Sequence, residues 1–99
     1  VSKGVSVDLN LGGGHPLSMK TLHILRKTTD PFAFEAIQSD PQAAVLLIQD
    51  AVLIKGSFPA ETYACHEDLA ARGIERPFRV VDYNDIARLI AEHDRVITW

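Results

Sequence analysis

The amino-acid sequence predicts an α/β fold: one small domain with a parallel sheet of four or five strands and helices on both faces. Two observations predict it. Short apolar runs of strand length alternate with capped helical segments along most of the chain. The run at residues 44–49 (AVLLIQ) is continuously apolar, which is typical of strands buried on both faces of a parallel sheet. A chain of 99 residues that is 46% hydrophobic suits a single domain with a limited core.

The predicted strands are short and rich in Val, Leu and Ile, and polar or turn-forming residues separate them from the helices. In chain order they are residues 20–26, 44–49, 61–65, 79–81 and 95–98.

The predicted helices carry recognisable start and stop signals. Asp30 and Pro31 begin the first helix, because Asp is a favoured N-cap and Pro suits the first helical position. Gly73 ends another helix, and Asp82 with Asp85 resembles a capping box at the start of the last one. In chain order the helices are residues 31–40, 50–55, 66–72 and 83–93.

The first eighteen residues differ in character from the rest. They contain a glycine triplet and no sustained hydrophobic period, and Met19 would make a natural start. We therefore expect residues 1–18 to be an N-terminal extension, either vector-derived or mobile, and residues 19–99 to form the domain. The alternative is a native first strand, because four apolar residues alternate with polar ones: Val5, Val7, Leu9 and Leu11.

Composition excludes several classes of function. The net charge of -3 argues against direct binding of nucleic acid, which needs clustered Lys and Arg. A single cysteine excludes a disulfide framework and a Cys-rich zinc site, and it fits a cytoplasmic location. The four histidines lack metal-ligand spacing, and no apolar run is long enough to span a bilayer. We expect no cofactor, no metal and no membrane association.

Cys65 is the candidate site residue. It lies where a predicted strand runs directly into a helix, and unpaired N–H groups at a helix N-terminus favour the reactive thiolate. Glu67 and Asp68 would oppose that effect, whereas a protonated His66 would support it. We expect a partly accessible thiol that could carry sulfur as a persulfide. The alternative is a buried packing cysteine, because free cysteine is among the most buried residue types.

Other residues favour structural roles. His66 and Cys65 are adjacent, and neighbours on a helix do not face each other, so a catalytic Cys–His pair is not expected. His23 lies inside a strand, which indicates a packed histidine or an interface residue and not a ligand. Asp50 follows a buried strand, and this position indicates a helix cap and not a general acid or base. Trp99 suits either the core or a subunit interface.

From Met19 onward, an ordered set of segments resembles the DsrH/TusB family of DsrE/F/H-like sulfur-relay proteins. The segments are residues 22–27 (LHILRK), 46–52 (LLIQDAV), 63–64 (YA), 67–73 (EDLAARG), 81–83 (VDY) and 92–99 (EHDRVITW).

The resemblance implies a small flavodoxin-like α/β domain that assembles with two related subunits, DsrE-like and DsrF-like (TusD-like and TusC-like), into a heterohexamer. In one branch of the family such a complex relays persulfide sulfur toward 2-thiouridine at the tRNA wobble position. In the other branch it serves bacterial sulfur oxidation. A stand-alone α/β binding module without catalysis is the third interpretation.

The sequence departs from the family pattern at three places. Ala51 stands where the family usually has glycine, and the segment 53–60 looks shortened. Cys65 stands where TusB-like chains carry an apolar residue. The sulfur-carrying cysteine of the related DsrE/TusD type occupies a similar frame ending in Leu-x-Arg-Gly, which residues 69–73 resemble at Leu69, Arg72 and Gly73. The chain thus resembles the accessory subunit with a cysteine where the carrier subunit has one.

Overall fold

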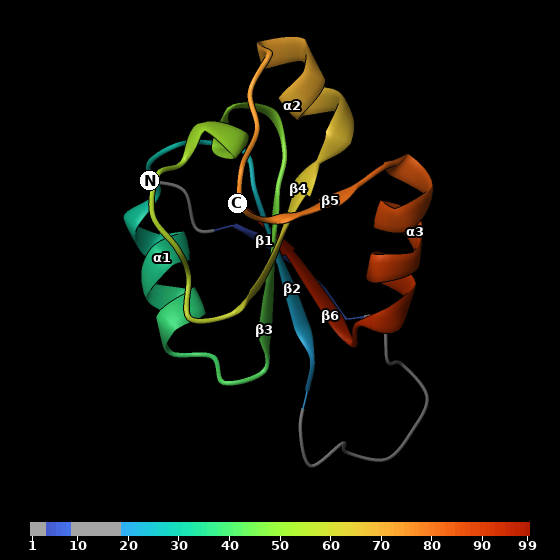
Figure 1. The fold of residues 1–99 in the computed structure, drawn as a ribbon. Helices are drawn as coiled ribbons and strands as arrows, with labels where there is room; N and C mark the ends of the chain where they lie inside the picture. Colours follow the sequence, from blue (N-terminus) through green and yellow to red (C-terminus); the bar gives the residue numbers. More distant parts are fainter. Residues whose placement is uncertain (1–3, 9–18) are drawn as a thin grey trace.

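The computed structural model describes residues 4–8 and 19–99, which build a six-stranded sheet with helices on both faces (Figure 1). The strands are β1 (Val5–Asp8), β2 (Thr21–Leu25), β3 (Ala43–Leu47), β4 (Glu61–Cys65), β5 (Arg79–Val81) and β6 (Arg95–Thr98). The helices are α1 (Pro31–Gln38), the short 3-10 helix η1 (Gln49–Leu53), α2 (His66–Arg72) and α3 (Tyr83–Glu92).

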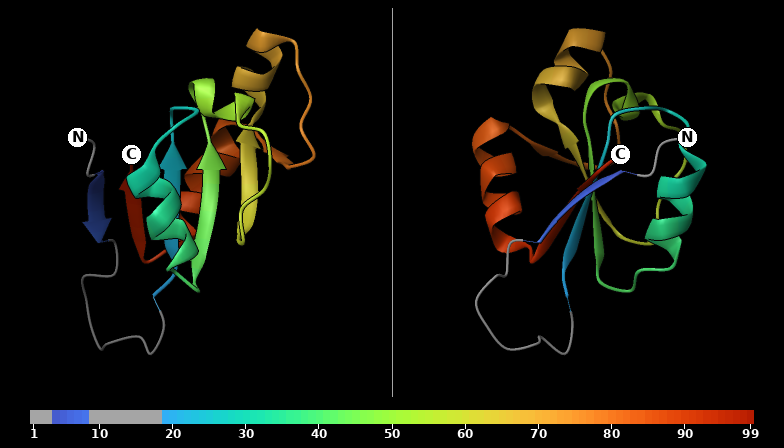
Figure 2. Two further views of the ribbon diagram at one scale, coloured as in Figure 1. Left: turned by 90° about the vertical axis from the view of Figure 1, so that its left-hand side faces the viewer. Right: turned by 180° about the vertical axis from the view of Figure 1, so that it is seen from behind.

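The sheet has the order β1-β6-β2-β3-β4-β5 (Figure 2). The five strands from β6 to β5 are parallel to one another, which confirms the predicted parallel α/β sheet. The chain builds outward from β2 to β5 and then returns through α3 to place β6 on the other side of β2.

β1 adds an antiparallel strand at one edge, where Val5 pairs with Thr98 and Val7 with Val96. Part of the segment that was expected to be an extension is therefore a strand, as the alternative interpretation held. The remaining residues of that segment, 1–3 and 9–18, lie outside the described residues. The domain boundary at Met19 stays a prediction.

The helix α1 begins where the Asp-Pro pair predicts. The Asp30 carboxylate is buried; its Oδ1 accepts from the backbone N–H of Ala33 at 3.2 Å, and its Oδ2 lies 3.3 Å from Lys27 Nζ. A buried carboxylate that caps a helix and pairs with a lysine holds the β2–α1 connection in one conformation.

The helix α3 begins with a reciprocal capping box. Asp82 Oδ1 accepts from the backbone N–H of Asp85 at 2.8 Å, and Asp85 Oδ2 accepts from the N–H of Asp82 at 3.2 Å. The predicted cap is confirmed, although the helix ends at Glu92 and His93 is its C-cap, not a member of its last turn.

Asp82→Ala should lower the Tm by roughly 4 °C, because the first turn of α3 loses its cap. The pKa of the Asp82 carboxyl is lowered, chiefly by the backbone N–H of Asp85. Its stabilisation is therefore present above the ordinary pKa of 3.8 and is lost as the pH falls through the lowered value. Thermal melts of wild type and variant should converge in strong acid. A difference that persists there would contradict a charge-dependent cap.

The core has two layers, one on each side of the sheet. Figure 1 shows α1 on one side and α3 on the other, with the sheet seen nearly edge-on between them. The α1 side buries apolar residues of β2, β3, η1 and α2 together with Trp99. The α3 side buries the alternate residues of β2 and β3, together with residues of β4, β5 and β6 and with Leu89 of α3. Both faces of the central strands are therefore apolar, as the continuous run in β3 predicts.

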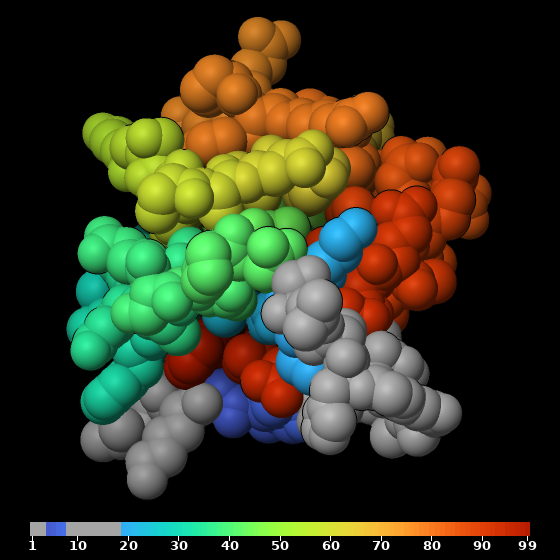
Figure 3. All heavy atoms as spheres, turned by 90° about the horizontal axis from the view of Figure 1, so that it is seen from below, coloured from blue at the N-terminus to red at the C-terminus, as the bar shows by residue number. Residues whose placement is uncertain are grey.

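The amino ends of the parallel strands meet at the opposite end from the candidate site. Figure 3 views this end, with the α1–β3 connection in green, the start of β2 in light blue and the end of α3 in red. Lys20 joins the strands here: its carbonyl accepts from the N–H groups of Asp94 and Arg95 at 2.9 and 3.1 Å. Thr21 donates to the carbonyl of Gln42 at 3.2 Å.

Candidate functional site at the carboxyl ends of the strands

Cys65 lies where the sequence predicts, at the carboxyl end of a central parallel strand. It is the last residue of β4 and the N-cap residue of α2, with an extended backbone (φ -69°, ψ 122°). The thiol makes no capping hydrogen bond to the first turn of α2. The predicted position of Cys65 at a strand-to-helix junction is therefore confirmed, and in open α/β sheets binding sites form at this edge.

The expected exposure of the Cys65 thiol is wrong, because the residue is 0% exposed in the described chain. Alternation along β4 turns Tyr63 and Cys65 toward α3 and Ala64 toward the other side. On that side the start of α3 covers the strand end. Sequence reasoning predicted the strand end but not which face Cys65 would occupy.

A pocket of about 270 Å³ lies over Cys65, between the carboxyl ends of the central strands and the start of α3. Its rim carries Tyr83, which is 65% exposed, and Gln49. The other lining residues are Ile24, Leu46, Ile48, Asp68 and Ile86. The thiol therefore lies under a mostly apolar lining, next to a rim of polar side chains.

Burial raises the pKa of the Cys65 thiol to about 11, and the Asp68 carboxylate adds to the rise. The backbone N–H groups of Glu67 and Asp68 act in the opposite direction, as expected at a helix N-terminus, but do not outweigh burial. At neutral pH the residue is therefore a protonated thiol. Protonated cysteine is a poor nucleophile, so this environment does not activate it.

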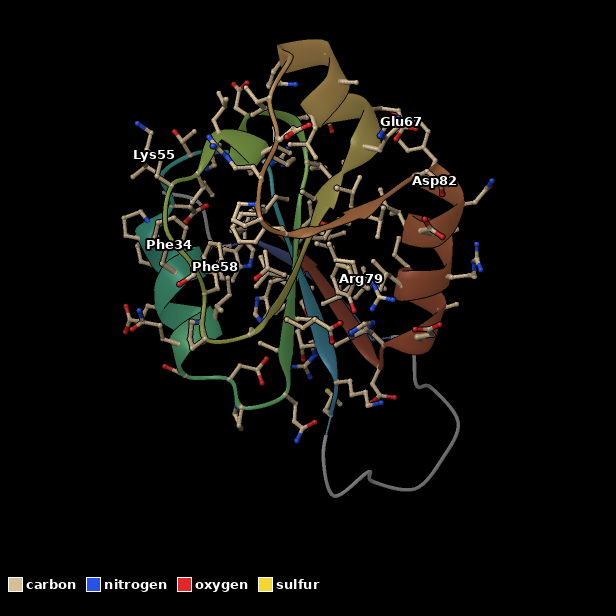
Figure 4. All side chains as sticks on the ribbon, viewed as in Figure 1. Phe34, Lys55, Phe58, Glu67, Arg79 and Asp82 are labelled. Atoms are coloured by element: carbon tan, nitrogen blue, oxygen red, sulfur yellow. The ribbon has the colours of Figure 1, made fainter. Side chains whose placement is uncertain are left out.

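Two acidic residues of α2, Glu67 and Asp68, lie near the thiol at this edge of the sheet. Cys65 Sγ donates to Glu67 Oε1 at 3.5 Å. Figure 4 shows Glu67 near the start of α2 and Asp82 at the start of α3. The pKa of the Tyr83 hydroxyl is raised, first by the charge that Cys65 carries when ionised and also by Glu67 and Asp68. The negative field here disfavours a thiolate further.

Asp50 takes no part in capping, which corrects the predicted role. The short helix η1 has Ile48 as its N-cap without a side-chain hydrogen bond, because the helical turn already begins at Gln49. Asp50 is 68% exposed, and its Oδ1 instead accepts from Arg72 Nη2 at 2.8 Å. Asp50 is a surface ion-pair residue and not a buried acid or base.

A polar network that sequence reasoning missed fastens η1 to α2. Asp68 Oδ2 accepts from the backbone N–H of Gln49 at 2.8 Å, and Asp68 Oδ1 lies 3.6 Å from Arg72 Nη1. Gln49 has a φ of 53°, a conformation that non-glycine residues rarely adopt, and the Asp68 bond supports it. The spacing of Asp68 and Arg72 on one helix was a usable signal, whereas their link to η1 depends on tertiary contacts.

The histidines do not complete a site with Cys65. His66 is exposed, and the hydrogen-bond partner of the thiol in the described chain is Glu67. His23 is packed in the interior on the other side of the sheet, as the packing interpretation expected. Over residues 4–8 and 19–99, no three His, Cys, Asp or Glu side chains are grouped so that they could hold a metal ion. No helix in the described part has the length and hydropathy that crossing a membrane requires.

Comparison with known proteins gives a family but no individual relative. The family model described as DsrH like protein matches residues 32–96, from α1 to β6 and thus through the whole candidate site. No curated protein and no solved structure matches the chain. Proteins of the matched family act in sulfur-relay complexes with partner subunits. The match covers more than half of the 99 residues, and the chain belongs to the DsrH-like family.

Proposed function

We propose that this protein is an accessory subunit of a complex that passes persulfide sulfur toward 2-thiouridine at the tRNA wobble position. The observation that carries the proposal is the family match, which spans β3, β4, β5 and the helices between them. Segments that resemble the DsrH/TusB family, including residues 46–52 and 81–83, lie within the matched region.

The environment of Cys65 supports an accessory role over a carrier role. A carrier thiolate attacks the outer sulfur of a donor persulfide, R–S–SH; the Cys–S–SH bond forms and the donor leaves as its thiolate. That step needs an accessible, ionised sulfur. Cys65 is buried, and its pKa of about 11 keeps it protonated at neutral pH. We therefore place the sulfur-carrying cysteine on a partner subunit.

Persulfide transfer through Cys65 is the second candidate function. Its position at a helix N-terminus and its frame with Leu69, Arg72 and Gly73 favour it. In this case a partner would have to displace Tyr83 or the start of α3 to reach the thiol. Mass spectrometry of the chain after incubation with a persulfide donor and its partners separates the two roles, since only a carrier gains 32 Da at Cys65 (about one sulfur atom).

The partners that fit the proposal are related DsrE-like and DsrF-like subunits, and the complex would act in the cytoplasm. The chain itself carries a net charge of -3, so direct contact with tRNA is not expected. Affinity purification of the tagged chain from its native host should recover two small related proteins in fixed ratio. Recovery of the chain alone would favour the stand-alone binding module.

Deletion of the gene, followed by nucleoside analysis of wobble uridines, tests the proposed pathway. The 2-thio group should be lost and should return with the wild-type gene. Unchanged thiolation in the deletion strain, together with impaired growth on reduced sulfur compounds, would replace the proposal with the sulfur-oxidation branch of the family.

A further inference from the structure

Three side chains from distant parts of the sequence form a hydrogen-bonded chain inside the protein, on the α1 side of the sheet. Trp99 Nε1 donates to His23 Nδ1 at 3.2 Å, and His23 Nε2 lies 3.1 Å from Asp40 Oδ2. The two rings lie 6.2 Å apart with their planes inclined by 9°. His23 is 1% exposed and Trp99 is 7% exposed, so water cannot readily replace the bond between these two side chains, whereas Asp40 is partly exposed.

The chemistry of the indole fixes the state of the histidine. An indole N–H can only donate, so His23 Nδ1 must be the acceptor and the ring proton must be on Nε2. Nε2–H then donates to the Asp40 carboxylate. In the imidazolium form both ring nitrogens carry protons, and Nδ1–H would point at the Trp99 N–H. The arrangement seen is therefore compatible only with neutral His23.

We propose that Asp40, His23 and Trp99 form a proton-sensitive latch that holds the end of β6 against β2 and opens when His23 is protonated. Asp40 would keep its bond to the imidazolium, whereas Trp99 would lose its acceptor.

The segment that the latch holds carries further contacts. The Trp99 N–H donates to the carbonyl of Ile24 at 2.9 Å, and its carbonyl accepts from Arg26 Nε at 3.0 Å. Gly4, next to β1, packs so closely on the indole that a Cβ there would lie 2.8 Å from Trp99 Cε3. Release of the indole therefore loosens the edge of the sheet where β1 and β6 pair.

The charged groups near His23 belong to α1, β2 and β6 or to residues that follow these elements. Asp40 follows α1 and bonds to the ring, and Glu35 of α1 lines the cavity beside Trp99. Arg95 is the charged residue of β6, in register with Thr21, and Arg26 follows β2 and holds the Trp99 carbonyl. On β3 the register partner of His23 is apolar Val45. Among the described residues, the charged group bonded to the imidazole is the Asp40 carboxylate, so it should set how readily the latch opens.

Hydrogen exchange of the indole N–H tests the latch, because Trp99 is the single tryptophan of the chain. Protection relative to a free indole should fall about tenfold as the pH is lowered and His23 gains a proton. His23→Phe keeps an aromatic ring but has no acceptor, so its low protection should not depend on pH. Asp40→Asn keeps an acceptor for Nε2–H without the charge that favours the imidazolium, and should move the transition to lower pH.

His66→Asn is the matched control, since this exposed histidine begins α2 and is not part of the latch, and it should leave the transition unchanged. Constant protection of the wild-type indole N–H, from neutral pH down to the acid limit of the fold, overturns the proposal. A wild-type transition that persists in His23→Phe also overturns it. If His23→Phe does not fold, Asp40→Asn decides: an unshifted transition in this variant is the contradictory result.

Discussion

At neutral pH the Cys65 thiol of the folded chain should react with iodoacetamide at least about a hundredfold more slowly than in the unfolded chain. A pKa of about 11, compared with an ordinary value of 9.0, leaves about a hundredfold less thiolate at this pH. Complete burial of the side chain slows the reaction further, since the reagent must wait for a local opening.

The rate of alkylation against pH gives the sharper readout. For an unfolded thiol the alkylation rate should level off above about pH 10, whereas for folded Cys65 it should continue to rise to the alkaline limit of the fold. Stopped samples analysed by mass spectrometry measure both curves, with urea-unfolded protein as the internal control. A folded-state rate equal to the unfolded one would mean that the thiol is accessible and has an ordinary pKa, which would restore the carrier interpretation.

Trp99→Ala should reduce the free energy of unfolding by about 3–5 kcal/mol. The indole is buried in the α1-side core and donates to His23, so truncation leaves a cavity and an imidazole without its donor. For a domain of this size, stability of about 5–15 kcal/mol is usual, and the variant would lie near the limit of folding. Urea unfolding followed by circular dichroism measures the change.

Tyr83→Ala is the matched control, because Tyr83 is also aromatic but is largely exposed. Its midpoint of unfolding should stay close to that of wild type. Equal effects of the two substitutions would mean that Trp99 is not a core residue. In that case its other predicted role, at a subunit interface, would regain support.

The elements of this fold were predictable because their signals are local. Asp30–Pro31, Gly73 and the Asp82–Asp85 pair mark helix ends through contacts within one turn, and the structure contains each of them. β1 was harder, because a strand of alternating Val and Ser, residues 5–7, is stable only beside a neighbour. The pairing of β1 with β6 joins residues about ninety positions apart, so a local sequence pattern does not predict it.

The candidate site was predictable in position but not in environment. The strand-to-helix junction placed Cys65 at the carboxyl edge of the sheet. Its burial depends on the start of α3, whose Tyr83 and Ile86 reach over β4 from the next unit of the chain. The ion pair of Asp50 with Arg72 and the burial of Trp99 likewise depend on how separate elements meet. Sequence periodicity predicts helices and strands, whereas the pKa of a thiol depends on the residues that pack around it in the folded chain.

Complementation of the deletion strain with Cys65→Ala most directly tests whether this subunit is accessory. Alanine retains the apolar character of the site and removes the only sulfur that the chain could use as a cysteine carrier. Thermal melts and co-purification of the variant with its partners establish that it folds and assembles. The 2-thio group of the wobble uridine should then return to the wild-type level. A variant that folds and assembles but leaves these uridines unthiolated would contradict the account, and Cys65 would be the sulfur carrier.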